Sequence, residues 1–566
     1  MMYGKTRSST LNLIQNPDLI NPELFGNDAG EDEIPEVLDS YFLEKPEFHP
    51  FFNEATRLNF VRSRKGLGKS ALLRQVFFRR QKLGKGELLV YVKASDLIAL
   101  QEIDSSSPAS LTHGWQQRMC SRVNLELGSV IRFAGDDDSM ALVESSELNG
   151  FRGRNLVGAL IDRLRIKAKG IEVSRERVQM GDSEVLLKRV SEKKDLTVWL
   201  FIDDVDATFL NTETERLKAS TFFSACRNLA GSVSGLNIRA SVRTDVWAIL
   251  RQYDEALDKC EQYMLDLKWS TEETGKILNN KISAFFQRTR GSIPSVDPIS
   301  KAVFWEPFYW GPRKVEAYRP IHILSAGRPR WATQLSRLAG RNAFQLQRRR
   351  IGMSDIKSVM RDYGQSRLSD LYKEHRHQCP RLETLVESFS GGPSRFTTIE
   401  LLARLRSLVI ERFGMPVLDG IEIEPRELAV AHFLYRVGFI NARDDSATQG
   451  ESLHFIRFED RPHLLKEHIN IDDKLPWEVH PAYRTVLRIE GGFPDARDED
   501  PPQPQRSEFQ KKRKPRKEKS AQAEVSISIA TPEMTKPLAT QDVSPVKRRN
   551  RRKRKHAKKA SLTPSL

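Results

Sequence analysis

Cysteine is scarce in this chain, whose 566 residues include only 4. The four are Cys120, Cys226, Cys260 and Cys379, and they lie far apart without a C-x-x-C pair. Such spacing indicates neither a zinc site nor a disulfide framework. We therefore expect four reduced thiols, most of them buried in the fold.

Long apolar runs are missing as well. No stretch approaches the roughly 20 residues that span a membrane, and the first residues, MMYGKTRSSTLNLIQNP, contain no apolar segment of the signal-peptide type. We expect no membrane contact and a cytoplasmic location. A hydrophobic content of 39% with 29% charged residues is typical of a soluble protein. At about 150 residues per domain, the length predicts three or four units.

The net charge of +16 is unevenly distributed. Residues 501–566 contain 19 Lys or Arg and 5 Asp or Glu, a net charge of +14, which leaves 72 basic against 70 acidic residues in 1–500. Two dense blocks, 511–519 and 546–559, lack apolar periodicity, so we expect a disordered basic tail. Such a tail binds nucleic acid by counterion release without sequence preference. The alternatives are a signal for nuclear localisation and a solvated tail without a partner.

One glycine is missing from an otherwise complete motif. The pattern G-x-x-x-x-G-K-[ST] is met by SRKGLGKS, except that Ser63 stands in place of the first glycine. The apolar residues from Leu58 predict a strand before this loop, and the residues to Leu73 predict a helix after it. Strand, glycine-rich loop and helix in this order are typical of a P-loop nucleotide site. The alternative is a lysine-bearing helix start without a ligand.

The chemistry of phosphate binding requires each part of this loop. Gly66 and Gly68 allow backbone N–H groups to approach phosphate oxygens, and the helix N-terminus adds partial positive charge. We expect Lys69 to contact the β and γ phosphates of ATP and Ser70 to bind Mg²⁺. The full set of loop residues predicted to contact the nucleotide is Ser63, Arg64, Lys65, Gly66, Leu67, Gly68, Lys69, Ser70 and Ala71.

A second motif, TVWLFIDDVDATF, occupies residues 197–209 and runs from an apolar strand into three acids. The carboxyl end of a buried strand lies beside the phosphate loop in an open α/β sheet. Asp203 is predicted to hold Mg²⁺, directly or through water. Asp204 is predicted to orient or deprotonate the attacking water, with Asp206 as a second candidate. The alternative is that these acids cap the following helix.

Two further segments carry cations that the pattern places near the nucleotide. Arg243 ends a predicted strand at 237–242 and is expected at the γ-phosphate, although an ion pair with Asp245 explains it equally well. Arg328 and Arg330 flank a proline at an early helical turn, where proline is tolerated. We expect this helix to carry both arginines to the nucleotide. The alternative is a pair of surface arginines.

Strands alternating with helices predict an α/β fold with a mostly parallel sheet that carries the P-loop. Further strands are predicted at 87–92 and 263–268, and further helices near 115–127 and 155–166. A capping box at 270–273 opens a helical lid. The predicted units are a leader at 1–45, the P-loop core at 46–268, the lid and connecting helices at 269–379, a winged-helix-like domain at 380–490 and the tail at 491–566.

The winged-helix-like prediction rests on helices at 397–413 and 425–437 followed by a strand at 453–458. Domains of this order place a helix in the major groove of DNA. The second helix, however, carries only Arg426 and Arg436 as strong cations, against Glu427. A structural or protein-contact role is therefore at least as well supported as DNA reading.

The motifs RKGLGKSALL, FIDDVDATF, SVRTDVW, LKWSTEE and SAGRPRW, in this order, resemble the bacterial P-loop ATPases of the Sll1717 type. These are similar to the Orc/Cdc6-like and STAND branches of the AAA+ group, so the resemblance implies a P-loop NTPase core of the AAA+ or ASCE kind. The resemblance implies Walker A roles for Lys69 and Ser70 and Walker B roles for Asp203 and Asp204. It also implies a sensor-1-like Arg243 and a sensor-2-like Arg328 or Arg330. No arginine finger is assigned, because Arg227, Arg239 and Arg251 are all candidates.

Relatives of this kind act as nucleotide-driven switches, some in bacterial defence against phage and others in DNA transactions. We therefore expect a Mg²⁺-dependent ATPase that acts as a conformational switch and, by resemblance, forms a homo-oligomer on ATP. One alternative is a DNA-binding regulator or initiator-like protein in which ATP turnover is slow or incidental. Another is a scaffold with a degenerate nucleotide site.

Overall fold

The computed structural model describes residues 18–491, apart from residues 100–106, 132–136, 150, 152–182, 195, 208, 210–211, 311–312, 415, 419–426, 445–453 and 466–474. The helix expected near 155–166 and both basic blocks of the tail lie outside the described residues. None of the described helices combines the length and apolar character that crossing a membrane requires.

Five parallel strands form the central sheet in the order β2-β3-β4-β1-β5. Their bounds are β1 (Leu58–Ser63), β2 (Leu88–Lys93), β3 (Val198–Asp203), β4 (Leu236–Arg243) and β5 (Met264–Asp266). All five occur where the sequence predicts strands. This strand order is typical of an AAA+ core, so the predicted α/β fold class is confirmed.

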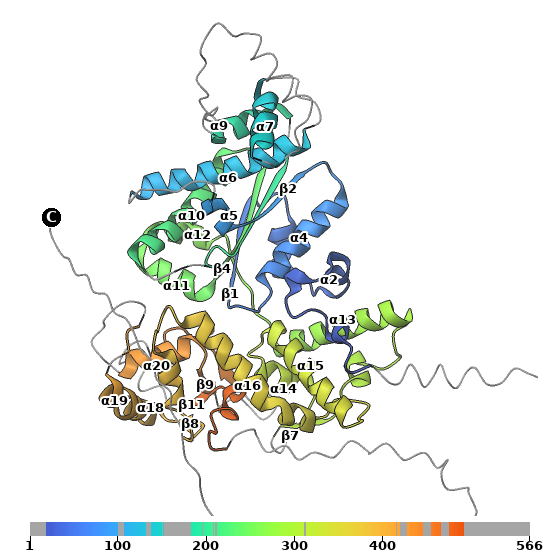
Figure 1. Cartoon of the computed structure of the whole chain (residues 1–566), viewed down its shortest axis with the longest axis vertical. Coiled ribbons are helices and arrows are strands. Elements are labelled where there is room, and N and C mark those ends of the chain that lie inside the picture. Colours follow the sequence, from blue (N-terminus) through green and yellow to red (C-terminus); the bar gives the residue numbers. More distant parts are fainter. Residues whose placement is uncertain are drawn as a thin grey trace, which may run out of the picture. The chain divides into compact units, whose positions relative to one another are not determined.

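Both faces of the sheet are covered, which explains why its strands are apolar runs rather than alternating ones. All six residues of β3 are buried. Leu200 and its neighbours on one face pack against α6 (Pro108–Val130), α10 (Glu213–Ser232) and α11 (Thr244–Tyr253). Trp199 and Phe201 face α4 (Lys69–Leu83) on the other side. Figure 1 shows α10 and α11 on one side of the sheet and α4 on the other. The remaining helices of this part are α2 (Pro35–Tyr41), α3 (His49–Phe52), α5 (Ala94–Ala99), α7 (Asp137–Leu148), α9 (Ser183–Lys194) and α12 (Asp258–Glu261).

A helical region follows the sheet, with the short strands β6 (Phe308–Trp310) and β7 (Arg313–Val315). Its helices are α13 (Thr271–Arg290), α14 (Tyr318–Leu324), α15 (Pro329–Gln345) and α16 (Met353–His375). The predicted capping box is present, because Ser270 and Glu273 exchange hydrogen bonds at the start of α13. These helices share a core with Leu24 and Phe25 of the leader.

The C-terminal region, residues 380–491, contains a small antiparallel sheet in the order β10-β9-β11-β8. The strands are β8 (Arg395–Phe396), β9 (Ile440–Asp444), β10 (His454–Ile456) and β11 (Trp477–Val479). The helices are α17 (Leu382–Glu387), α18 (Thr398–Leu405), a π-helical turn (Arg406–Ile410), α19 (Glu411–Phe413), α20 (Glu427–Arg436) and α21 (Pro481–Arg484). Leu368 and Leu371 of α16 join this core, so α16 belongs to two hydrophobic clusters.

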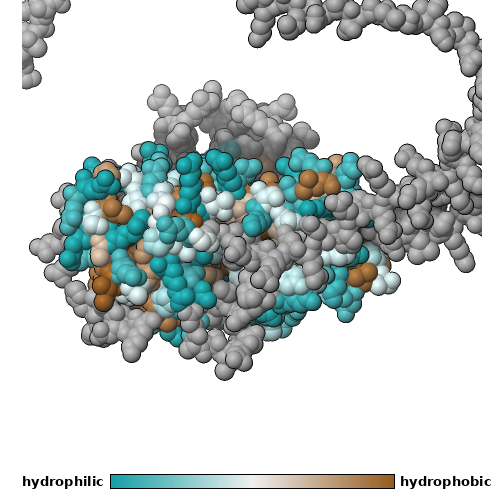
Figure 2. All heavy atoms as spheres, turned by 90° about the horizontal axis from the view of Figure 1, so that it is seen from below, coloured by the Kyte–Doolittle hydropathy of each residue, from teal (hydrophilic) through white to brown (hydrophobic). Residues whose placement is uncertain are grey.

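On the face shown in Figure 2, the described residues are mainly hydrophilic, and hydrophobic side chains appear in small separate groups. Single exposed apolar residues are normal on a protein surface. The visible part of this face is therefore a surface suited to water.

Candidate functional site

The carboxyl ends of β1, β3 and β4 lie at one edge of the central sheet. Ser63 at the end of β1 is in register with Arg243 at the end of β4, and β3 between β4 and β2 ends at Asp203. Ligands of open α/β sheets bind outside this edge. Segments far apart in the sequence, each predicted to carry chemistry, are thus brought together by the parallel topology.

The loop between β1 and α4 has the backbone that close approach to an anion requires. Gly66 has φ +82° and Gly68 has φ +102°, values that side-chain-bearing residues rarely adopt. The helix α4 begins at Lys69, so the N–H groups of its first turn lack helical partners. The loop and helix start together form an anion-binding geometry.

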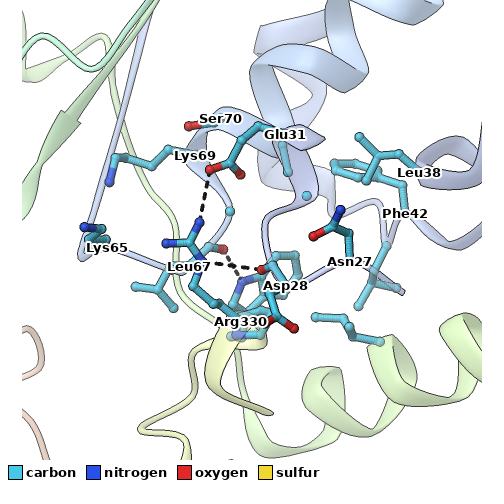
Figure 3. A pocket seen from close by; sticks show the side chains of 18 of the residues that line it. Asn27, Asp28, Glu31, Leu38, Phe42, Lys65, Leu67, Lys69, Ser70 and Arg330 are labelled. Carbon is cyan, nitrogen blue, oxygen red and sulfur yellow. Dashed lines mark hydrogen bonds and ion pairs between the residues drawn. The ribbon is translucent and has the colours of Figure 1, made fainter. Parts of the chain in front are cut away.

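A cavity of about 510 Å³ lies beside this loop. Ligand pockets commonly measure about 300 to 1,000 Å³. The predicted site residues that line it are Lys65, Gly66, Leu67, Gly68, Lys69, Ser70, Ala71, Asp204, Arg243 and Arg330. Those that do not are Ser63, Arg64, Asp203 and Arg328. In Figure 3, Lys69 and Ser70 lie on one side of this space, while Leu38 and Phe42 lie on the other.

Lys69 is held against its own loop. Its Nζ donates to the carbonyl oxygen of Ser63 at 3.1 Å and lies 3.5 Å from that of Arg64. Burial lowers the pKa of Lys69, and the charge of nearby Asp206 opposes this shift. The ammonium therefore has acceptors that a phosphate oxygen can replace.

Asp203 is fixed by donors on both carboxylate oxygens. The hydroxyl of Ser241 donates to Oδ1, and the hydroxyl of Tyr91 donates to Oδ2 at 2.8 Å. The side chain is buried and does not line the cavity. Among the two roles predicted for Asp203, this arrangement favours holding an ion through water over direct coordination.

Asp204, the next residue along the chain, differs from Asp203 in its exposure, its position and its backbone conformation. It is exposed, it lines the cavity, and its φ of +54° is unusual for a residue other than glycine. Its backbone N–H donates to Asp203 Oδ1 at 3.0 Å. The pKa of Asp204 is raised, because protein atoms remove part of its hydration and the charge of Asp203 lies beside it. Strained backbone of this kind clusters at functional sites.

Asp206 is buried but also lines the cavity. Its Oδ1 accepts from the backbone N–H of Arg243 at 3.2 Å, and its Oδ2 lies 3.5 Å from Arg243 Nε. Burial raises the pKa of Asp206 to about 6, against the opposing charges of Lys69 and Arg243. Asp206 therefore holds the end of β4, whereas Asp204 presents its carboxylate to the cavity.

Arg243 lines the cavity and is also paired with acids. Its Nε donates to Asp245 Oδ1 at 3.1 Å and its Nη2 donates to Asp245 Oδ2 at 2.5 Å. A third acid, Glu374 at the C-terminal end of α16, places Oε1 4.0 Å from Arg243 Nη2. Both sequence interpretations of Arg243, a cavity residue and a partner of Asp245, describe its position.

The two arginines at the start of α15 point to different places. Arg330 lines the cavity, donates to Glu31 Oε1 at 3.2 Å and lies 3.4 Å from the carbonyl oxygen of Asp28, as drawn in Figure 3. Arg328 lies outside the cavity, where its Nη1 donates to Glu374 Oε2 at 3.3 Å. Only 5% of Arg328 is exposed, so the surface alternative is wrong for this residue.

Ser63 and Arg64 face away from the cavity. Ser63 is buried, and its hydroxyl donates to the carbonyl oxygen of Arg64 at 3.1 Å. Arg64 Nη2 donates to the carbonyl oxygen of Arg436 at 2.6 Å, and its guanidinium is paired with Glu459. Both partners belong to the C-terminal region. The residue that replaces the first glycine of the motif is therefore part of the protein interior here.

The leader contributes to the cavity, which the sequence does not predict. The leader residues that line the cavity are Asn27, Asp28, Gly30, Glu31, Leu38, Tyr41, Phe42 and Leu43. Other segments add Ala207, Trp269, Ile277, Lys281 and Pro329 to the lining. A Cβ added to Gly30 would lie 2.9 Å from Ala71 Cβ, so the leader packs tightly on the start of α4. The apolar residues around Tyr41 and the Trp269 that precedes the capping box were the available signals.

The cavity fits a nucleotide in chemistry as well as size. Its phosphate-loop end carries Lys69, and its other end carries apolar and aromatic side chains such as Leu38 and Phe42. Ser70 presents a hydroxyl oxygen to this cavity, and Mg²⁺ takes oxygen ligands, several of them from phosphate and water. Among the described residues there is no cluster of three or more His, Cys, Asp or Glu arranged for a metal.

The three arginines considered as candidates for an arginine finger differ in how accessible their side chains are. Arg239 is fully buried and donates to the carbonyl oxygens of Phe51 and Asn53 at 3.0 and 2.9 Å. It therefore cannot reach the site of a second copy. Arg251 is paired with Asp258 at 3.6 Å, and Arg227 is exposed.

The helix considered for DNA reading is α20, and it is enclosed. All of its residues are buried or half-buried. Arg436 stacks against Phe433 with 5.3 Å between its guanidinium carbon and the ring centroid. Arg426 lies outside the described residues. The described α20 therefore belongs to the core of the C-terminal region rather than to its surface.

Comparison with known proteins gives distant likenesses. No family model matches the chain. A putative transposon gamma-delta 80.3 kDa protein of Escherichia coli K12 is 25% identical over 164 residues, which are 29% of this chain and 22% of that protein. Among solved structures, Drosophila ORC bound to DNA is 10% identical with a TM-score of 0.32, over 86% of this chain and 94% of that one. The Aeropyrum pernix ORC2 protein in ADPNP-ADP complexes is 11% identical with a TM-score of 0.34, over 76% and 87%. Likenesses of this size do not identify a function.

Proposed function

We propose that this chain is a Mg²⁺-dependent ATPase that uses nucleotide binding and hydrolysis as a conformational switch. One observation carries the proposal: Lys69 at the start of α4, Asp204 after β3 and Arg243 at the end of β4 line a single cavity at the phosphate loop. In P-loop ATPases, catalysis is almost entirely positioning and electrostatic stabilisation of phosphates, so this convergence is the requirement that matters.

Each residue has a role in this proposal. The loop amides and Lys69 bind the β and γ phosphates, Ser70 binds Mg²⁺, and Asp203 supports the ion through water. Asp204 orients or deprotonates the attacking water. The bound ion supplies charge neutralisation and ligand geometry for the phosphates. We assign the adenine base of the nucleotide to the apolar end of the cavity, which Leu38 and Phe42 line.

The switch follows from what surrounds the phosphates. The N–H of Arg330 donates to the carbonyl oxygen of Gly66 at 3.3 Å, so the lid helix α15 contacts the phosphate loop directly. Arg64 links the same loop to the C-terminal region. A ligand shifts a conformational equilibrium only through different contacts in the two states. The γ-phosphate provides such a difference between ATP and ADP.

Binding and turnover of ATP by the purified chain test the proposal. We expect Lys69→Ala to lower ATP affinity by more than about 100-fold and to abolish turnover, because a buried charge-assisted contact to phosphate is lost. Lys82→Ala, at an exposed position of the same helix, is the matched control and should leave both unchanged. Equal ATP affinity in wild type and Lys69→Ala would support a scaffold with a degenerate site.

The resemblance to Sll1717-type ATPases implies two biological outputs, defence of bacteria against phage and DNA transactions, and we extend the proposal to the first. Plaque counts on cells expressing the chain or its Lys69→Ala variant test this extension. Protection that requires Lys69 supports it, and equal plaque counts with and without the chain contradict it.

A second candidate is a DNA-binding regulator in which turnover is slow. The net charge of +14 in residues 501–566 favours it. Tight ATP binding without turnover, together with DNA binding that responds to ATP, would select this candidate over the hydrolytic switch.

A further inference from the structure

Glu374 lies where two of the predicted phosphate contacts meet. Its Oε2 accepts from Arg328 Nη1 at 3.3 Å, and its Oε1 lies 4.0 Å from Arg243 Nη2. Its backbone carbonyl oxygen is 3.4 Å from the same Nη2. These arginines come from separate elements, the start of α15 and the end of β4. One carboxylate of α16 therefore bridges both.

The carboxylate of Glu374 is charged and enclosed. Its side chain is 3% exposed. Burial alone would raise its pKa, but the charges of Arg328, His375 and Arg243 lower the pKa of Glu374 to about 2. A buried ion pair is costly to break, because it leaves a desolvated charge without a partner. Any ligand that takes Arg328 from Glu374 must supply a second anion.

Arg328 is held outside the cavity but next to it. It lines a smaller cavity of about 290 Å³ together with Glu374, Lys65 and Arg330, and the last two also line the larger cavity. Its Cβ is 3.9 Å from a Cβ added to Gly66. The guanidinium also stacks on Trp331, with its central carbon 4.1 Å from the ring centroid. The start of the Arg328 side chain therefore lies beside the phosphate loop, while its guanidinium is held by Glu374 and Trp331.

The end of α16 that carries Glu374 is anchored on its other side. His375 Nδ1 lies 3.0 Å from Gln378 Oε1, and Gln378 Nε2 donates to Asp245 Oδ2 at 3.0 Å. Asp245 is the main partner of Arg243. Because α16 packs into both the lid core and the core of the C-terminal region, Glu374 lies on a helix that the two cores share.

We propose that Glu374 is a positioning residue that competes with the terminal phosphate of a nucleoside triphosphate for Arg328, and so sets the discrimination between triphosphate and diphosphate. This inference rests on the proposed function and deepens it. A triphosphate draws Arg328 from Glu374 and releases the end of α16. A diphosphate has no terminal anion at this position and leaves the pair intact.

The competition has a measurable sign. Breaking the pair opposes binding of the triphosphate only, so Glu374 weakens triphosphate affinity relative to diphosphate affinity. Removing its charge, in Glu374→Gln, is expected to raise affinity for a non-hydrolysable ATP analogue about tenfold and to change ADP affinity less than twofold. Asp362→Asn, at an exposed position of the same helix, should change neither.

The test is titration calorimetry of the full chain with Mg²⁺, the β,γ-imido analogue of ATP and ADP. Arg328→Ala should lower analogue affinity, and in that background Glu374→Gln should have no further effect, because the two act through each other. Equal changes for analogue and ADP, or additive effects of the two substitutions, would overturn the inference while leaving the proposed function standing. Absence of nucleotide binding by the wild type would overturn both.

A second variant keeps the test decisive if Glu374→Gln fails to fold. Glu374→Asp keeps the charge and shortens its reach by one methylene, which weakens the contact with Arg328. It should raise the ratio of analogue to ADP affinity above that of the wild type. An unchanged or lowered ratio in this folded variant overturns the inference.

Discussion

The sheet edge and the C-terminal region present cations and acids in opposite ways. At the sheet edge, the segments that follow β1, β3 and β4 bring Lys69, Asp204 and Arg243 to a cavity. In the C-terminal region, the helix considered for DNA reading, α20, is packed into the core. Both segments were singled out from local sequence patterns. The difference is that a parallel sheet fixes where its strand ends meet, whereas a helix pattern does not say which face stays exposed.

In the proposed function, the sheet edge carries the chemistry, and the C-terminal region responds to it through contacts with the phosphate loop. The C-terminal region reaches the phosphate loop through Glu459 and the carbonyl oxygen of Arg436, both partners of Arg64. These contacts connect the C-terminal region directly to the phosphate loop. The following experiments break or sharpen this distinction, in order of decreasing effect.

The largest effect is expected at Asp204. Asp204→Asn should lower ATP turnover about 100-fold, because general-base contributions lie in the range of 10² to 10⁴. ATP affinity should stay within about threefold, since the isosteric amide keeps the loop intact. Single-turnover and binding measurements check this. Loss of turnover in Asp206→Asn alone, with Asp204→Asn active, would move the role to Asp206.

Asp206 should act through stability rather than chemistry. Burial raises the pKa of Asp206 from 3.8 to about 6, so the folded chain binds a proton at this carboxyl group more tightly than the unfolded chain does. The stabilisation is fully present below the unfolded pKa and is lost as pH rises through 6. Relative to Asp206→Asn, the wild type should lose about 2 kcal/mol of unfolding free energy between pH 4.5 and 7.5. Urea unfolding at both pH values measures this. A difference independent of pH contradicts it.

Deletion of residues 501–566 should lower affinity for double-stranded DNA more than about tenfold at roughly 0.1 M salt, and flatten the dependence of affinity on salt concentration. The reason is the removal of most of the net positive charge. Fluorescence anisotropy with random-sequence DNA at several salt concentrations provides the measurement. Unchanged affinity after deletion would return DNA binding to the folded part of the chain.

The smallest effect is expected at α20. Arg436→Ala should change DNA affinity less than twofold, since the side chain stacks on Phe433 within the region. The tail deletion serves as the positive control in the same assay. A tenfold loss of affinity in this variant would show that α20 contacts DNA, and would erase the contrast with the sheet edge.

The sequence predicted the sheet well because its signals are local and strong. The apolar run of β3 followed by three acids, and the loop from Gly66 to Ser70, each occur within one short segment. The sequence missed the leader as a wall of the cavity. Its polar and acidic composition carries no period that predicts burial, and the contact of Gly30 with Ala71 depends on the whole fold.

Glu374 was missed for a similar reason. It lies in an ordinary amphipathic helix, and no spacing links it to Arg328 or Arg243. Arg328 shows the converse, because its motif predicted a place at the nucleotide but its partner holds it outside the cavity. Contacts between side chains of distant segments can be identified only in the folded structure.

By itself, the sequence determined the fold class, the phosphate loop and the acids of the strand end, because each is fixed by residues near one another along the chain. Only the tertiary structure decided which of these residues line the cavity, which acids neutralise the arginines and which helix is enclosed. The physical reason is that backbone geometry follows local sequence, whereas burial and ion pairing depend on which surfaces the folded chain brings together.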